Sequence, residues 1–259
     1  AEFTGAKLDD DAKDKLLAFV KQLPGDRLYV TSSVPLGKSS YVWPKTKVEL
    51  QFSALLSPGQ EGKFLFRELP KNGAPKAVPG SWSIKGRYAR FAVQGELKKE
   101  TNYEIAVGAD VVGQLGEHLG GAHKMVFTTG ATPEVDVSGK FNAILQQSLI
   151  GTQNAKIAFL QATGGQVTGA LLTKFQQGDV EKGSVEGHVS GKVLVLDPFY
   201  LDTTFGKFFV EQGITTTCVD KNNDKFADTC KGSFPFKFGG TTYTVNMTFN
   251  RLSLPPTNP

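Results

Sequence analysis

Short apolar runs alternate with turn residues in the first half of the chain. In residues 48–52 and 103–107, apolar and polar side chains alternate with a period of two, which is typical of strands with one buried face. Seven such runs lie at 28–31, 47–52, 63–69, 81–84, 88–93, 103–107 and 124–128. Strands this short and closely spaced predict a β-sandwich between residues 27 and 130.

A second series of alternating runs follows a short linker, residues 131–134. Its longest member, 242–252, places Tyr243, Val245, Met247 and Phe249 on one face and threonine or asparagine on the other. The runs lie at 137–145, 156–162, 167–175, 183–189, 192–196, 207–210, 233–238 and 242–252. About eight strands joined by hairpin-like turns predict an antiparallel up-and-down barrel.

One helix is expected, over residues 9–23. Asp9, Asp10 and Asp11 supply an acidic first turn, Leu16, Val20 and Leu23 form an apolar stripe, and Pro24-Gly25 ends the pattern. A short amphipathic helix cannot bury its stripe alone. Either it packs on the following β domain, or it belongs to a segment that connects to upstream protein.

Several short motifs and single residues between residues 27 and 130 follow one another in the order found in one protein family. They are Pro35, the sequence Val-Glu-Leu-Gln-Phe-Ser at 48–53, Leu97 followed by Tyr103, the turn at Gly116, and Phe-Thr-Thr-Gly at 127–130. With these features the segment resembles a bacterial Ig-like domain, of a type common in surface and secreted proteins. The resemblance implies a spacer or adhesion module rather than a catalyst.

The second half carries a different order of small motifs, at residues 137–141, 160–169, 183–187 and the final strand. In this order it is similar to small bacterial lipocalin-like or avidin-like barrels. Those families often begin with Gly-x-Trp, and here Phe141 stands in place of the tryptophan. A barrel of this size is either filled by side chains or holds one small ligand.

The predicted fold class is all-β, with one short N-terminal helix. The expected domains are an N-terminal helical segment at 1–26, an Ig-like β-sandwich at 27–130 and an antiparallel, lipocalin-like β-barrel at 131–259. The 29 Gly, 13 Pro and 19 Phe among 259 residues agree with strands and turns.

The charge pattern argues against a nucleic-acid partner, and the length of the apolar runs argues against a transmembrane segment. The 29 basic and 25 acidic residues give a net charge of +4 with the signs interspersed, which does not predict a nucleic-acid-binding surface. We interpret the densest basic group as the solvated face of one hairpin, the alternative being a patch for nucleic acid or anionic lipid: Lys85, Arg87, Arg90, Lys98 and Lys99. Because no run approaches about 18 apolar residues, we expect no transmembrane segment in this chain.

Oxygen-bearing side chains recur in one loop of the second half. Counted from Asp220, Asn222 and Asp224 stand at positions 3 and 5 and Asp228 at position 9, with the backbone carbonyl of Phe226 at position 7. Calcium takes about six to eight oxygen ligands, so the pattern predicts a calcium site. The loop resembles the Asp-rich calcium loops of the EF-hand, dockerin and thrombospondin-repeat kind.

The loop departs from those families at two positions. Lys225 replaces the usual glycine at position 6, and no glutamate follows at position 12. Either the affinity is modest, or a remote carboxylate such as Asp197 or Asp202 completes the shell. The alternative is a polar hairpin loop without an ion, because Asp and Asn side chains also bind their own backbone.

Cys218 and Cys230 are the only two cysteines, and they bracket this loop. Two cysteines that flank one loop predict a disulfide between them, which would stabilise the fold by about 3 kcal/mol. The alternatives are a pair of reduced cysteines and a pair of soft metal ligands. The separation of the two cysteines in the sequence, however, matches no Cys-x-x-Cys motif. A disulfide implies an oxidising location: secreted, periplasmic or at the cell surface, where calcium is abundant.

We found no catalytic motif of high specificity, and therefore predict a non-enzymatic protein. The expected function is that of a binding or adhesion module of a bacterial secreted or cell-surface protein. A calcium ion and a disulfide would stabilise the module, which would belong to a lipoprotein or to a larger exported chain. Its partner would be a surface protein, a glycan or a lipid. Two alternatives stay open: a barrel that binds a lipid or glycan, and accessory domains of a secreted hydrolase.

Overall fold

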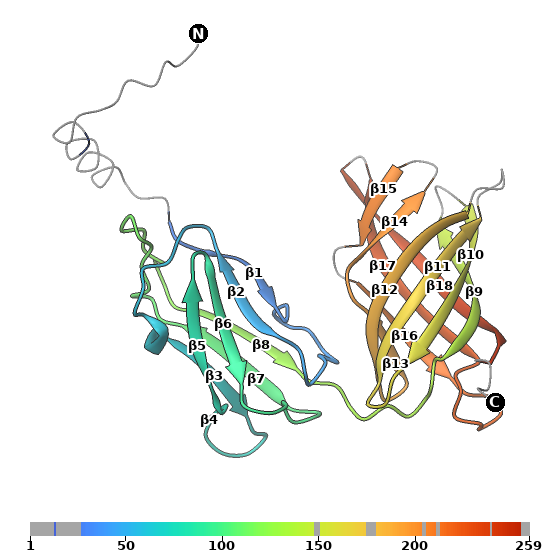
Figure 1. The fold of residues 1–259 in the computed structure, drawn as a ribbon, viewed down its shortest axis with the longest axis horizontal. Coiled ribbons are helices and arrows are strands. Elements are labelled where there is room, and N and C mark those ends of the chain that lie inside the picture. The colour runs from blue at the N-terminus through green and yellow to red at the C-terminus, as the bar shows by residue number, and fades with distance from the viewer. Residues whose placement is uncertain are drawn as a thin grey trace, which may run out of the picture. The chain divides into compact units, whose positions relative to one another are not determined.

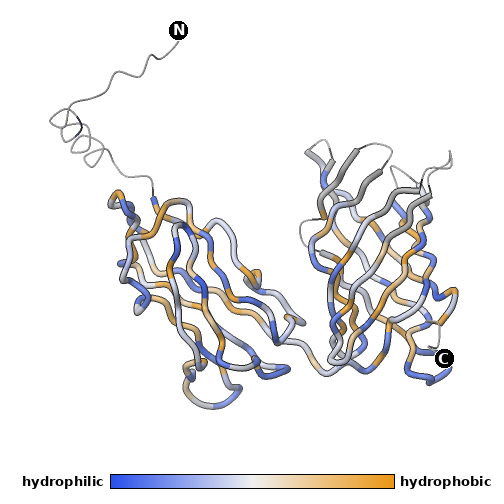
Figure 2. Tube along the Cα trace, in the orientation of Figure 1, coloured by the Kyte–Doolittle hydropathy of each residue, from blue (hydrophilic) through white to orange (hydrophobic). Residues whose placement is uncertain are grey.

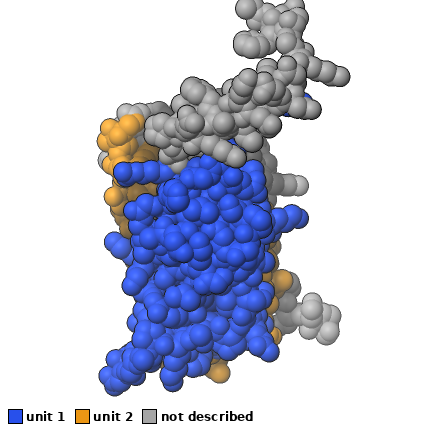
Figure 3. Space-filling model, turned by 90° about the vertical axis from the view of Figure 1, so that its left-hand side faces the viewer, with its two compact units in different colours: residues 1–129 blue, residues 130–259 orange. Residues whose placement is uncertain are grey.

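The computed structural model describes Lys13 and residues 27–147, 151–174, 180–203, 206–210, 213–238 and 240–254. The chain divides into two compact units, Ala1–Thr129 and Gly130–Pro259, which Figure 3 colours separately. Apart from Lys13, the helix predicted over residues 9–23 lies outside the described residues.

Unit 1 consists of two four-stranded antiparallel sheets (Figure 1). The first has the order β1 (Val30–Val34), β2 (Val48–Phe52), β6 (Tyr88–Val93), β5 (Gly80–Lys85). The second has the order β4 (Lys76–Ala77), β3 (Phe64–Leu69), β7 (Asn102–Val107), β8 (His123–Thr128), and a 3-10 turn at Glu61–Lys63 precedes β3. The predicted β-sandwich is confirmed.

The two sheets of unit 1 share one hydrophobic core. In β2, Val48, Leu50 and Phe52 are buried while the residues between them are partly exposed, so the period of two read in the sequence selects the inner face. Aromatic rings join the sheets: the centroids of Phe66 and Phe91 lie 5.1 Å apart, with the rings edge to face. Figure 2 shows the resulting alternation of hydrophobic and hydrophilic residues along the strands.

Unit 2 contains a closed, eight-stranded antiparallel barrel (Figure 1). The order is β10 (Gly151–Gln161), β11 (Gln166–Lys174), β12 (Val180–Ser190), β13 (Val193–Leu196), β16 (Ile214–Val219), β17 (Thr229–Phe238), β18 (Thr241–Ser253), β9 (Gly139–Gln147). The barrel closes because β18 pairs with both β17 and β9. The predicted eight-stranded barrel is confirmed.

One of the eight runs predicted to form barrel strands does not belong to the barrel. The run at 207–210 lies in β15 (Gly206–Val210), which pairs with β14 (Phe199–Thr203) in a separate two-stranded sheet. Its place in the barrel is taken by β16, in which Ile214, Thr216 and Cys218 are buried. Threonines occupy both faces of β16, so hydrophobicity alone does not reveal its alternation.

Three aromatic side chains pack against one another in the barrel core. The ring of Phe159 lies 5.6 Å from that of Phe141 and 5.5 Å from that of Phe249, centroid to centroid. Val135, Val137 and Ala227, which precede β9 and β17 in the chain, belong to the same buried cluster, and we call this end of the core the closed end of the barrel. Residues from the linker and from a loop thus complete the core that the strands begin.

We predict that Phe159→Ala lowers the free energy of unfolding of the barrel by about 3–5 kcal/mol, because it leaves a cavity in this cluster. Leu160→Ala is the matched control, since the neighbouring side chain points outward and is 64% exposed; its effect should stay within about 0.5 kcal/mol. Urea unfolding followed by circular dichroism measures both. Equal losses for the two variants would contradict the observed strand orientation.

Candidate functional site

The Asp-rich loop joins β16 to β17, and a disulfide holds its base. Cys218 and Cys230 are directly opposed in the β16–β17 register, and their sulfur atoms are bonded. Both side chains are 1% exposed and belong to the barrel core. The predicted disulfide is therefore confirmed, and it ties the two strands together where the loop leaves the barrel.

Each aspartate of the loop binds a backbone N–H group. Asp220 Oδ2 accepts a hydrogen bond from Lys225 N at 2.9 Å, and Asp228 Oδ2 accepts one from Lys221 N at 2.7 Å. Asp224 Oδ1 accepts one from Phe226 N at 2.8 Å. These carboxylates therefore shape the loop by satisfying backbone donors, as the ion-free alternative expects.

The remaining predicted ligand, Asn222, binds within the loop as well. Its Nδ2 donates to Asp224 Oδ2 at 3.0 Å, and its Oδ1 accepts a longer hydrogen bond of 3.4 Å from Asp224 N. The side chains at positions 3 and 5 are thus neighbours in space, with the amide nitrogen of Asn222 facing the carboxylate of Asp224. All the hydrogen bonds described for this loop are compatible with a conformation that forms without an ion.

Lys225 adopts the backbone conformation that glycine provides in calcium loops. Its φ is +71°, in the left-handed region that non-glycine residues seldom occupy, and Asn223 has a φ of +60°. The hydrogen bond from Lys225 N to Asp220 holds this bend in place. The strain expected from the missing glycine is therefore accommodated by the first aspartate of the loop.

One carboxylate oxygen of the loop is left over. Asp220 Oδ1 is buried and has no hydrogen-bond partner in the described part of the chain. Within the same residues, however, no three His, Cys, Asp or Glu side chains gather as a metal-binding group. The loop thus offers one oriented, unsatisfied ligand rather than an assembled site of three carboxylates.

Asp197 and Asp202 do not lie beside the loop. Asp197 follows Leu196, which pairs with Ile214 at the start of β16, whereas the loop begins after the end of that strand. The intervening strand spans about 17 Å. The backbone of Asp202 lies in β14, which pairs with β15 in a separate sheet and not with β16 or β17, the strands that carry the loop. A remote carboxylate from either position is thus not available to complete a shell in this arrangement.

The side chain that holds the loop to the barrel, Arg251, belongs to no motif in the sequence. Its Nε donates to Ala227 O at 2.7 Å, while Nη1 and Nη2 donate to Ser138 O at 2.5 Å and to Asp136 O at 3.2 Å. The guanidinium carbon lies 4.7 Å from the ring centroid of Phe141. One residue of β18 therefore holds the loop and the segment before β9.

The backbone of that segment also pairs with the loop. Asp136 N donates to Lys225 O at 2.7 Å, and Ala227 N donates to Asp136 O at 2.9 Å, forming an isolated parallel bridge. Val135 and Val137, on either side, are buried in the core. Because the partners are about 90 residues apart in sequence, no local pattern could have revealed this pairing.

The carboxylates around Arg251 offset the cost of burying its charge. Burial lowers the pKa of the Arg251 guanidinium, while the negative charges of Asp228, Asp136, Asp224 and Asp220 raise it. The arginine thus supplies positive charge to the same region in which a calcium ion was predicted.

Comparison with known proteins identifies the first unit. Residues 25–129 match the family model of the bacterial Ig-like domain, which confirms the resemblance read in the sequence. No curated protein matches the chain. The Ig-like unit and the disulfide fit an oxidising, extracellular or surface location. Among the described residues, no helix has the length and hydrophobicity needed to span a membrane.

One solved structure aligns with most of the chain. It is the crystal structure of native alpha-2-macroglobulin from Escherichia coli spanning domains MG0-NIE-MG1, with 13% sequence identity. The alignment covers 87% of this chain and 98% of that chain, with a TM-score of 0.30. A similarity this low supports no conclusion about fold or function.

We predict that Arg251→Met lowers the free energy of unfolding of the barrel by about 3 kcal/mol, because three carbonyls lose charged donors. Lys231→Met, on the adjacent strand β17, removes an exposed cation of similar length and should change stability by less than about 0.5 kcal/mol. Urea unfolding in the presence of EDTA measures both. A loss as small as that of the control would show that Arg251 does not hold the closed end together.

Proposed function

We propose that this chain is a non-catalytic binding or adhesion module of a secreted or cell-surface protein, and that its Asp-rich loop binds calcium. The match of residues 25–129 to the bacterial Ig-like domain supports the class of protein, because the resemblance to that family implies a spacer or adhesion module. The calcium part is carried by one observation, the buried and unpartnered Oδ1 atom of Asp220.

A buried carboxylate oxygen without a donor is costly, by about 1–3 kcal/mol or more for a charged group. A cation next to Asp220 Oδ1 removes that cost. Calcium prefers hard oxygen ligands. Besides Asp220, the loop offers oxygen atoms from Asn222, Asp224, Asp228 and the carbonyl of Phe226. Since Oδ2 of Asp220 is bound by Lys225 N, the orientation of the first ligand is already fixed.

The affinity should be weak. Asp224 and Asp228 must share or give up backbone hydrogen bonds to reach a common ion, and the cations of Lys221, Lys225 and Arg251 oppose it. We expect a dissociation constant of about 10⁻⁴–10⁻³ M, the range of extracellular calcium modules. Such a site fills only where calcium is abundant, which agrees with a location outside the cytoplasm.

The lipocalin-like alternative requires a ligand inside the barrel. Near the closed end, the described interior is occupied by Phe141, Phe159 and Phe249, whose rings are in contact. The side chains of residues 171–182 and 201–209 lie outside the described part of the chain. No described contact therefore favours an internal ligand, and we place the binding role of this module on its surface.

Thermal unfolding in a calcium series tests the proposed site. We predict that calcium, added to EDTA-treated protein, raises the melting temperature of the disulfide-bonded barrel in proportion to RT ln(1 + [Ca²⁺]/Kd), and that magnesium at equal concentration does not. Asp220→Asn should abolish the rise, because it replaces the ligand oxygen that is oriented and unpartnered.

Asn223→Gly is the matched control within the loop. Residue 223 stands between two ligand positions and has a positive φ that glycine tolerates, so this variant should keep the calcium response. A melting temperature that ignores calcium in the unmodified protein would reduce the loop to a polar turn. An equal response of Asp220→Asn and the unmodified protein would place the ion elsewhere.

A further inference from the structure

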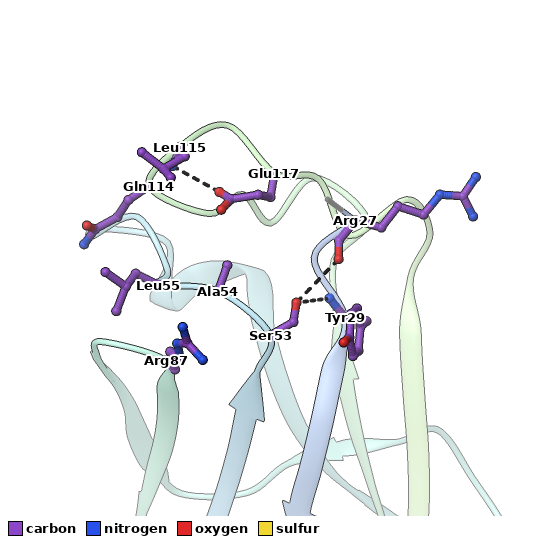
Figure 4. Close-up of a pocket in the computed structure, with 9 residues that line it drawn as sticks. All are labelled: Arg27, Tyr29, Ser53, Ala54, Leu55, Arg87, Gln114, Leu115 and Glu117. Carbon is purple, nitrogen blue, oxygen red and sulfur yellow. Dashed lines mark hydrogen bonds between the residues drawn. The ribbon is translucent and has the colours of Figure 1, made fainter. Parts of the chain in front are cut away.

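A hollow with apolar walls lies at the end of unit 1 at which the described chain begins (Figure 4). It has a volume of about 600 Å³ and is lined by Arg27, Tyr29, Ser53, Ala54, Leu55, Arg87, Gln114, Leu115 and Glu117. A second hollow of about 480 Å³ shares Leu55 and Arg87 with it and adds Lys85. We call Arg27, Tyr29, Leu55, Lys85, Arg87 and Leu115 the basic apolar patch.

The apolar side chains of the patch are strongly exposed. Tyr29 is 58% exposed, Leu55 47% and Leu115 55%, although most residues of these types are buried in folded proteins. They come from three separate segments that converge on the same hollow, as Figure 4 shows. A grouping of this kind, surrounded by polar residues, is typical of an interaction site rather than of scattered surface residues.

Hydrogen bonds hold these segments in position. Tyr29 N donates to Ser53 Oγ at 3.1 Å, and Gln114 N donates to Leu55 O at 2.8 Å. Leu115 N donates to Glu117 Oε2 at 3.0 Å. The patch is therefore formed in advance, which lowers the entropic cost of covering it.

The rim of the patch is positive. Among the described residues, no carboxylate is recorded in an ion pair with Arg27, Lys85 or Arg87, whereas some other cations of unit 1 are paired, as in Lys63–Asp110 and Lys98–Glu68. The one carboxylate of the lining, that of Glu117, already accepts the Leu115 N–H group. An occupant that complements the patch must combine apolar side chains with negative charge.

The segment directly before the patch has both properties. Residues 9–23 begin with the acidic run Asp9, Asp10 and Asp11 and end with Leu16, Val20 and Leu23 at the spacing of one helical face. Asp14 and three lysines, Lys13, Lys15 and Lys21, complete the charges of the segment, so its negative charge is concentrated at its first turn. Only residues 24–26 separate Leu23 from Arg27, so the two positions lie within about 14 Å of each other. A connection this short gives an effective concentration in about the millimolar range.

We propose that residues 9–23 dock on the basic apolar patch of their own chain. Leu16, Val20 and Leu23 cover Tyr29, Leu55 and Leu115, while the aspartates lie toward the basic rim. Docking buries an apolar stripe that a short helix cannot bury alone, and it removes exposed apolar surface from water. Of the two roles that the sequence left open for the segment, the proposal assigns it the first, packing on the following β domain.

Hydrogen–deuterium exchange on the full chain tests the proposal. In the unmodified protein, the amides of residues 9–23 should exchange at least about tenfold more slowly than in a synthetic peptide of the same sequence. Leu55→Asp should return them to the rate of the peptide. Leu65→Asp is the matched control, because Leu65 is also 47% exposed but lies outside the patch, and it should leave the protection unchanged.

A charge reversal separates electrostatic from apolar docking. Arg87→Glu should also accelerate exchange in residues 9–23, Lys71→Glu should not, and Asp10→Lys combined with Asp11→Lys should partly restore protection to Arg87→Glu. Near-ultraviolet circular dichroism checks folding, since both tryptophans, Trp43 and Trp82, lie in unit 1.

Three outcomes would overturn the proposal. The first is exchange of residues 9–23 at the rate of the peptide in the unmodified protein. The second is protection that both Leu55→Asp and Arg87→Glu leave intact. The third is protection of the patch that increases with protein concentration, which would assign the surface to a second copy of the chain.

Discussion

The closed end of the barrel depends on the guanidinium of Arg251. Its N–H groups reach three carbonyls that belong to two segments far apart in the sequence, and its flat face lies over Phe141. A lysine could not replace it, because an ammonium group neither spans several diverging acceptors nor stacks on a ring in this way. Through this contact the last strand fixes the segment before the first strand, which in turn pairs with the Asp-rich loop.

The same arginine sets the electrostatic conditions of that loop. The carboxylates of Asp220, Asp224 and Asp228 are balanced by Lys221, Lys225 and Arg251, so the loop needs no ion for charge neutrality. What it lacks is a partner for one buried oxygen. A calcium ion would satisfy that oxygen against the repulsion of three nearby cations. The weak affinity that we propose would therefore follow from the way the loop is anchored, and not only from its missing glycine and glutamate.

The sequence predicted what depends on local periodicity. Strand β18 could be read in advance because Val245, Met247 and Phe249 alternate with polar residues, and the disulfide because Cys218 and Cys230 flank one loop. Strand β16 was missed because its threonines lie on both faces. The role of Arg251 was missed because its partners lie up to 115 residues away. Nor could spacing show which oxygen of each aspartate would bind the backbone.

Both candidate sites lie where strands end, and the reason is general. Along a strand, alternation commits one side chain to the core and the next to solvent, so few positions are left for specific chemistry. Loops carry no such constraint. In unit 1 they expose Tyr29, Leu55 and Leu115 together, and each Å² of apolar surface removed from water there contributes about 25 cal/mol. The unpaired cations around them restrict what can cover this surface, because a basic or neutral apolar segment would leave those charges uncompensated. Hydrophobic burial therefore supplies the driving force at this site, and charge selects the occupant.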